Sequence, residues 1–268
     1  MLSKRFASLV LCLATGLVLL VSGCGGGGSG PGAKDPVVMY LNACQDGPVA
    51  FFANDTNESG TLAYRAKTKF KSIPFIDQAQ GGYDLSVEEP NRSIVYDNQA
   101  TIFQKDTSSI VAAVGVKNPV GTEQLKRLKL SLFNPDRTQP IGNRARIIFF
   151  HGFNRKSPFG TPQLVLQTVG DQPLFQSPDN DYGKFVALEV DSGTYKFYGT
   201  GDIRNDYFIA KDPDNDQIYG LPPVDGAGNP KPVTLKAGGI YIVMLSGVEN
   251  ANGKPSELSF LEVEPDTP

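Results

Sequence analysis

Short apolar or alternating segments, separated by Gly, Pro, Asn and Asp, follow one another along most of the chain. This punctuation is typical of all-β proteins, whose strands of about four to eight residues are joined by turns. The segment 81–87 illustrates it, because Tyr83, Leu85 and Val87 share one face under the two-residue period of a strand. Helical periodicity is nearly absent, so the sequence predicts an all-β fold. The predicted strands are 37–41, 70–76, 81–87, 93–96, 109–115, 128–133, 146–150, 193–197, 239–247 and 258–264.

The order of the strands repeats once along the chain. Four strands of the second half follow the order of four strands of the first half and carry similar turn residues. We therefore predict an internal duplication, with a first β-sandwich at 36–136, a linker at 137–144 and a second β-sandwich at 145–268. Two unrelated β stretches with similar turn chemistry are the alternative. The matched segments are 37–41 with 146–150, 81–85 with 193–197, the run ending at Gly115 with 239–247, and 128–136 with 258–266.

The two halves differ in the length of one segment. Tyr83 and Ile110 are 27 positions apart, whereas the matching Tyr195 and Ile242 are 47 positions apart. The additional residues, about 199–231, are rich in Asp, Asn, Gly and Pro. We expect this insertion to lie on the surface, where long insertions often carry function.

The first 23 residues have the pattern of an export signal. Two basic residues precede an apolar run from Ala7 to Val21, which is shorter than the roughly 20 residues of a membrane-spanning helix. The run ends in Val21-Ser22-Gly23-Cys24, which resembles the lipobox of bacterial lipoproteins. The resemblance implies that the chain is cut before Cys24, which is diacylated on its sulfur and acylated on its new N-terminus. An ordinary signal peptide with a chance cysteine is the alternative.

Residues 24–35 are predicted to be the lipidated cysteine and a flexible tether, because Gly25 to Gly28 and the Gly-rich residues after them bury nothing. Each buried methylene contributes about 0.8 kcal/mol, so two or three acyl chains anchor a protein stably where one does not. Gram-negative lipoproteins retained in the inner membrane usually carry Asp after the cysteine. Gly25 therefore favours the outer membrane, and the membrane is the expected partner of the anchor.

Charge and cysteine content narrow the function classes. Removal of residues 1–23 leaves 23 basic and 28 acidic residues, a net charge of −5. A mildly acidic, mixed surface argues against nucleic acid as a partner. Apart from the signal and the lipid site, the chain has one cysteine, Cys44, so an intramolecular disulfide is excluded. We expect Cys44 to be a small buried hydrophobe.

Three motifs in the second half carry a family resemblance: Arg146 to Gly152, Leu188 to Tyr195 and Val233 to Tyr241. They resemble domain-of-unknown-function family 4397, whose members are exported or lipid-anchored bacterial proteins without an assigned activity. The resemblance covers about 145–265 well and 37–136 weakly. Asn42 stands near the family's histidine position in the first half. The resemblance implies immunoglobulin-like β-sandwiches, as the strand count also suggests.

Catalytic motifs are absent from the sequence. The chain has one histidine, His151, and neither a G-x-S-x-G elbow nor an H-E-x-x-H motif accompanies it. An imidazole without catalytic partners is inert, so we expect His151 to be a strand-end residue that hydrogen-bonds a loop backbone. No catalytic residue is predicted. A pair of carboxylates in a cleft, as glycoside hydrolases use, is the alternative that the sequence leaves open.

Alternate carboxylates make one candidate metal site. Asp212, Asp214 and Asp216 have the spacing with which calcium loops collect oxygen ligands. Gln217 and Pro223 stand where an EF-hand has its turn glycine and bidentate glutamate. These departures favour an ordinary solvated turn, with calcium as the alternative and no other cofactor predicted. Four tyrosines, Tyr182, Tyr198, Tyr207 and Tyr219, are expected to pack over the rim of the sandwich, with an aromatic ligand face as the alternative.

Together these features predict an all-β protein with two tandem immunoglobulin-like antiparallel β-sandwiches. The expected function is that of a lipid-anchored, non-catalytic cell-envelope protein with a structural or extracellular binding role. Its protein or glycan partner is not encoded in any motif. The alternatives are a secreted carbohydrate-active enzyme that uses a carboxylate pair and a solute-capture lipoprotein of an uptake system. The expected location is the outer membrane of a Gram-negative bacterium.

Overall fold

The computed structural model of the chain divides it into two compact units, residues 1–34 and 35–268, and the fold below is that of the second unit. Cys24 and most of the predicted tether lie outside the residues that the structure describes. The described residues are 33–119, 126–154, 162–167, 173–195, 207–211, 218–221, 232–248 and 256–265.

The all-β prediction is confirmed, since the described residues form strands and a single short 3₁₀ turn, η1 (Gln78–Gln80). The carboxylate of Asp77 caps this turn by accepting the N–H of Gln80 at 2.9 Å. The strands are β1 Val37–Asn42, β2 Ala50–Ala53, β3 Thr56–Asn57, β4 Lys71–Ser72, β5 Tyr83–Glu88, β6 Val95–Thr101, β7 Ser108–Val114, β8 Lys129–Phe133, β9 Arg144–Asn154, β10 Gln163–Gln167, β11 Pro173–Gln176, β12 Phe185–Asp191, β13 Gly193–Tyr195, β14 Tyr207–Lys211, β15 Ile218–Leu221, β16 Val233–Leu235, β17 Ile240–Val248 and β18 Ser256–Val263.

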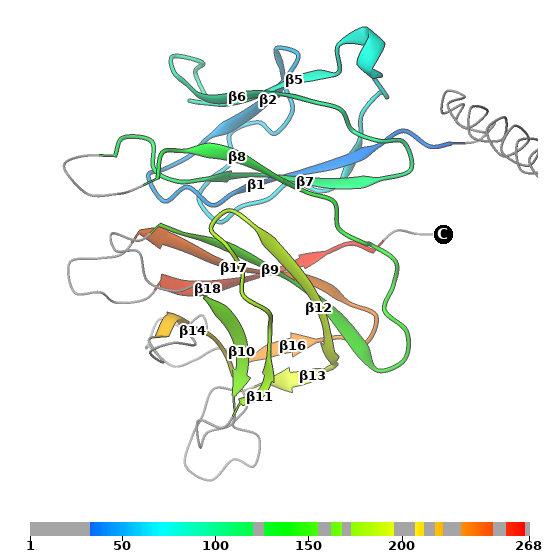
Figure 1. Cartoon of the computed structure of the whole chain (residues 1–268), viewed down its shortest axis with the longest axis vertical. Coiled ribbons are helices and arrows are strands. Elements are labelled where there is room, and N and C mark those ends of the chain that lie inside the picture. The colour runs from blue at the N-terminus through cyan, green and yellow to red at the C-terminus, as the bar shows by residue number, and fades with distance from the viewer. Residues whose placement is uncertain are drawn as a thin grey trace, which may run out of the picture. The chain divides into compact units, whose positions relative to one another are not determined.

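The first half consists of two four-stranded sheets that enclose a core of their own (Figure 1). The outer sheet has the order β3-β2-β5-β6 and the inner sheet the order β4-β1-β7-β8. Their facing side chains include Tyr40 of β1 and Phe51 of β2, whose ring centroids lie 5.1 Å apart, together with Leu85 and Val111. This first core buries the alternate residues that the strand pattern places on one face.

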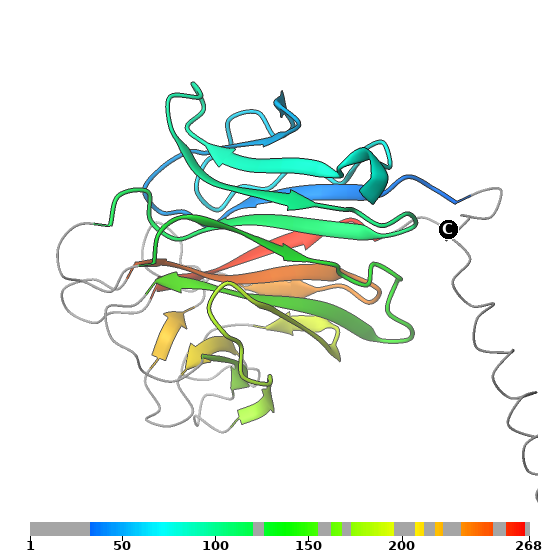
Figure 2. The ribbon, with the colours of Figure 1, turned by 45° about the horizontal axis from the view of Figure 1, so that its top comes forward.

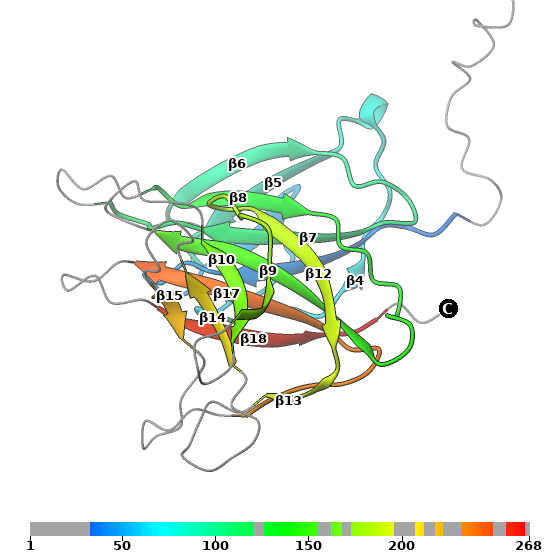
Figure 3. The same cartoon turned by 60° about the horizontal axis from the view of Figure 1, so that its bottom comes forward.

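The second half is built on one eight-stranded sheet with the order β11-β10-β14-β15-β18-β17-β9-β12. Figure 3 shows β10, β14 and β15 lying across the β9, β17 and β18 part of the same sheet. Side chains from both parts, such as Phe149, Leu164, Phe208 and Val243, meet in a second core. The separate two-stranded ribbon β13-β16 adds Tyr195 and other apolar residues to it.

A third apolar layer joins the two halves. Figure 2 shows the sheets of the two halves stacked on one another. Met39 and Ile110 of the inner sheet pack here with Phe150, Ile242 and Met244 of β9 and β17. The strands β1, β7, β9 and β17 are therefore buried on both faces, which explains their nearly unbroken apolar sequences. We call this contact the joining layer.

The central strands of each half pair in parallel, within sheets whose other strand pairs are mainly antiparallel, as predicted. β1 pairs in parallel with β7, and β9 pairs in parallel with β17. Parallel neighbours need a long crossover connection. In the first half the chain supplies it by forming β2, β3, β5 and β6 between the two strands.

The sheet register places equivalent residues of the two halves at equivalent positions. The order β4-β1-β7-β8 corresponds to β12-β9-β17-β18, with Met39 opposite Ile110 and Ile148 opposite Ile242. The same register makes Gly115 and Gly247 equivalent, and both have positive φ, +126° and +115°.

The predicted match between residues 81–85 and 193–197 is not reproduced by the strand pairing in the sheets. β5 pairs with β2 in the outer sheet, and the strand that pairs in the same way with β10 is β14 rather than β13. β14 and β15 fall within the predicted insertion at 199–231, so those residues belong to the sheet instead of a surface loop. Phe208 and Ile209 of β14 are fully buried.

Replacement of Gly115 by Ala is expected to destabilise the protein, because a Cβ there would lie 2.4 Å from the carbonyl oxygen of Arg127. The positive φ alone costs roughly 1–3 kcal/mol for a side chain, and the close approach adds to it. The control is Gly60→Ala, where φ is +64° and no atom lies within 4 Å of the added Cβ. Equal losses of unfolding free energy in urea for the two variants would contradict this account.

Cys44 is fully buried directly after β1, in agreement with the expected small hydrophobe. Burial raises the pKa of its thiol to about 11. At the same pH this lowers the reactive thiolate fraction about a hundredfold compared with a thiol of pKa about 9.

We therefore expect Cys44 to react slowly with a thiol reagent in the native protein and rapidly in denaturant. Cys44→Ser is the control that identifies the labelled site. Rapid native labelling that disappears in Cys44→Ser would show that the thiol is accessible.

Arg137, in the predicted linker, is buried between the halves. Its Nε and Nη2 donate to the carbonyl oxygen of Glu264 at 3.1 and 2.8 Å, and its Nη1 donates to Ser108 Oγ at 3.1 Å. The guanidinium also lies 3.9 Å from the ring centroid of Phe70. The linker is thus tied to both halves at this residue.

Candidate functional site

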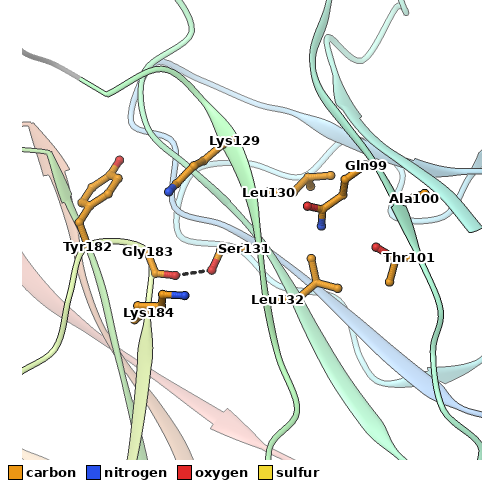
Figure 4. A pocket seen from close by; sticks show the side chains of 10 residues that line it. All are labelled: Gln99, Ala100, Thr101, Lys129, Leu130, Ser131, Leu132, Tyr182, Gly183 and Lys184. Atoms are coloured by element: carbon orange, nitrogen blue, oxygen red, sulfur yellow. Dashed lines mark hydrogen bonds between the residues drawn. The ribbon is translucent and has the colours of Figure 1, made fainter.

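A polar hollow of about 370 Å³ lies where two edge strands of the first half meet a turn of the second half. β6 ends the outer sheet and β8 ends the inner sheet, and the turn is the one that precedes β12. Figure 4 shows Gln99 of β6 on one side of β8 and Lys184 of the turn on the other. The lining residues are Gln99, Ala100, Thr101, Lys129, Leu130, Ser131, Leu132, Tyr182, Gly183 and Lys184.

The alternation of side chains along β8 determines which of them extend toward the hollow. Leu130 points into the first core, while Lys129 and Ser131 lie on the opposite face of the strand. The hydroxyl of Ser131 donates to the carbonyl oxygen of Gly183 and thereby links β8 to the turn. The N–H of Leu130, on the unpaired edge of β8, donates to Asp97 Oδ2 at 2.7 Å.

The turn is held by hydrogen bonds to the end of β9. His151 Nδ1 donates to the carbonyl oxygen of Asn180 at 2.8 Å, and the Asn180 amide donates to the carbonyl oxygens of Phe149 and Lys184. His151 therefore hydrogen-bonds a loop backbone, as the sequence suggested, but it lies within β9 rather than at the end of the strand. At the equivalent position of the first half, the amide of Asn42 donates to the carbonyl oxygens of Leu62 and Gly47.

Two lysine ammonium groups lie over the ring of Tyr182, the aromatic residue that lines the hollow. The ammonium groups of Lys126 and Lys129 lie 4.4 and 5.6 Å from the ring centroid of Tyr182, and the His151 ring meets the same ring edge-on. Burial raises the pKa of the Tyr182 hydroxyl. Its oxygen is buried without a hydrogen bond to any described residue. Tyr182 is therefore packed beneath lysines rather than presented as an open aromatic face.

The hollow carries positive charge. Its ten lining residues include two lysines and no carboxylate. Lys129 and Lys184 are exposed, and neither forms an ion pair with a carboxylate in the part of the chain that the structure describes. Gln99, Thr101 and Ser131 add neutral hydrogen-bonding groups to the same space.

A smaller hollow of about 130 Å³ extends the site along the same two strands. It shares Thr101 and Leu132 with the larger one and continues to Asn134, whose side-chain oxygen accepts from the hydroxyl of Ser109 at 2.8 Å. No carboxylate lines this second hollow either. The two together form a polar groove between β6 and β8.

Of the candidate residues from the sequence, Tyr182 is in the lining of the hollow. Asp212, Asp214, Asp216 and Tyr198 lie outside the described residues, and Tyr207 and Tyr219 lie in β14 and β15. The described ranges contain no group of three His, Cys, Asp or Glu residues arranged to hold a metal ion. In the same ranges no helix is long and apolar enough to cross a membrane.

Sequence reasoning missed Lys129 and Lys184. Lys129 alternates with buried leucines and therefore has the pattern of a solvent-facing strand residue, and Lys184 lies 55 positions further along the chain. No local spacing joins them. The register of β8 against β7, the hydrogen bond from Ser131 to Gly183 and the stacking of Phe133 on Phe185 bring the two segments together.

Comparison with known proteins gives few matches. No family model matches the chain, and no curated protein sequence matches it. Among solved structures, the chain is similar to "The Bacillus anthracis TIE protein", with a TM-score of 0.20 and 7% identity over 80% of this chain and 33% of that chain. The chain thus spans about a third of the length of that protein. A similarity at this level carries no argument about function.

Proposed function

We propose that this protein is a lipid-anchored, non-catalytic component of the bacterial cell envelope that binds a ligand in the groove between β6 and β8. The observation that carries the anchor is the sequence Val21-Ser22-Gly23-Cys24 at the end of a short apolar run. A Gly-rich tether then separates Cys24 from the first strand, which begins at Val37. This arrangement would hold a folded body near a membrane while leaving its sides accessible.

Binding is favoured over hydrolysis by the residues of the groove. The carboxylate pair of a glycoside hydrolase would be expected in a concave site, and neither described hollow has a carboxylate in its lining. The groove instead offers ammonium, amide and hydroxyl groups from three separate segments. Such convergent polar groups in a concave site are typical of ligand recognition.

The same proposal includes a duplicated, immunoglobulin-like architecture. Equivalent strand orders in the two halves, the equivalent glycines Gly115 and Gly247, and the equivalent positions of Asn42 and His151 support descent from one repeated unit. We propose that the second half is related to domain-of-unknown-function family 4397, which its sequence motifs resemble. We also propose that the protein is located in the outer membrane of a Gram-negative bacterium, because Gly25 follows Cys24.

Replacement of Cys24 by Ala is expected to abolish incorporation of labelled palmitate and to remove the mature protein from the membrane fraction. The acylated sulfur exists only at Cys24, so the effect should be complete. Cys44→Ala is the matched control and should incorporate palmitate like the wild type, because that thiol is buried. A wild-type protein that takes up no palmitate would refute the anchor.

A further inference from the structure

We propose that the groove between β6 and β8 binds a hydroxylated carboxylate of the uronic-acid type, with Lys129 and Lys184 holding its negative charge. This inference rests on the proposed binding function and specifies its ligand. Hydroxylated carboxylates come from two sources, acidic oligosaccharides and small hydroxy acids. The geometry favours the oligosaccharide.

Charge is the first argument. Two ammonium groups from different elements approach a hollow that has no carboxylate in its lining, and neither lysine is neutralised by an ion pair with a described carboxylate. The chain as a whole is acidic, with a net charge of −3. A local cationic site on an acidic protein attracts an anion, and its lysines act as point charges that suit a single carboxylate.

Neutral hydrogen-bonding groups are the second argument. Gln99 and Thr101 of β6 line the hollow on the side opposite Lys184 (Figure 4). The hydroxyl of Ser131 already donates to Gly183, so its oxygen is left to accept a hydrogen bond from a ligand hydroxyl. An amide and two hydroxyls match a ligand that carries several hydroxyl groups beside its carboxylate.

Size and shape are the third argument. The larger hollow measures about 370 Å³ and shares Thr101 and Leu132 with the smaller one of about 130 Å³. Sites of about 300–1,000 Å³ accommodate small organic ligands. A groove that continues along two strands is suited to consecutive sugar units rather than to one small molecule.

An acidic peptide is disfavoured by the edge of β8. A peptide that adds to a sheet edge needs a row of unpaired backbone groups. The N–H of Leu130, in the middle of that edge, is already bonded to the Asp97 carboxylate at 2.7 Å.

The test measures binding to the purified full-length protein by titration calorimetry with four probes: trigalacturonate, the neutral trisaccharide of galactose, citrate and triglutamate. We expect trigalacturonate to bind, the neutral trisaccharide to bind at least about tenfold more weakly, and added salt to reduce the difference. Lys129→Gln with Lys184→Gln should weaken trigalacturonate binding about tenfold or more, because charge-assisted contacts are lost. Lys129→Arg with Lys184→Arg should retain most of it.

Lys236→Gln is the matched control, because this lysine is also exposed but pairs with Glu262 away from the groove. It should leave trigalacturonate binding unchanged. Binding of citrate as tight as that of trigalacturonate would assign the site to small hydroxy acids, and tighter triglutamate binding would assign it to acidic peptides. Either result would overturn the saccharide assignment, as would equal binding of the acidic and neutral trisaccharides. The palmitate experiment is independent of all four probes, so failure of the ligand and failure of the anchor are distinguishable.

Discussion

Phe150→Ala is expected to lower the free energy of unfolding by about 3–5 kcal/mol, the usual cost of removing a buried aromatic ring. Phe150 is fully buried in the joining layer, and its ring centroid lies 4.2 Å from that of Phe185. Phe185 in turn stacks on Phe133 of the first half with centroids 4.9 Å apart. The substitution therefore opens a cavity between the halves, and both should lose stability together.

The measurement is urea unfolding followed by two probes, one reporting on each half. We expect the two transitions to coincide in the wild type and in Phe150→Ala. The control is Leu174→Ala on β11, whose side chain is 57% exposed and should cost less than about 0.5 kcal/mol. A loss below about 1 kcal/mol for Phe150→Ala would contradict the joining layer as a source of stability.

Residues 145–268, expressed alone, are expected to unfold cooperatively but to associate in solution. The fragment retains the second core, in which Phe149, Phe208 and Val243 meet. It also exposes the apolar face that the first half covers in the intact chain, including Ile242 and Met244. Contiguous apolar patches of this kind promote association. A second β-sandwich with a core of its own would fold independently, and the exposed face of the joining layer adds the association.

Ile242→Ser is expected to destabilise the intact chain and to reduce the association of the isolated fragment. In the intact chain it should cost about 2–5 kcal/mol, because it buries a hydroxyl and leaves a cavity. In the fragment it should reduce association, which sedimentation velocity would record. If the unmodified fragment stays monomeric, its apolar face does not need to be covered by the first half or by another molecule. A fragment without a cooperative transition would show that 145–268 has no independent core.

The sequence predicted the strands that are buried on both faces, but it missed β2 and β10, whose residues are nearly all buried. β1, β7, β9 and β17 have long apolar runs because both their faces are covered. β12 has a partly exposed pattern and lies at a sheet edge, so period-two reasoning did not find it. The predicted strand 70–76 is reduced to β4, because only Val37 and Val38 of β1 pair with it.

Neither the parallel pairing nor the candidate site could be predicted from the sequence, and the physical reason is the same for both. Which strands become neighbours depends on packing across the joining layer, and no residue of β1 or β7 encodes that choice locally. Lys129, Lys184 and Gln99 come from three segments that meet only after the sheets have formed. The backbone hydrogen bond of His151 was predictable, since it joins a residue in the C-terminal part of β9 to a nearby turn.

The most direct test of the central claim, a lipid-anchored binding protein, is the mass of the N-terminal peptide of the mature protein. The account predicts a peptide that begins at Cys24 and carries a diacylglyceryl group on the sulfur and a third acyl chain on the amino group. A mature protein that begins at another residue, or an unmodified Cys24, would contradict it.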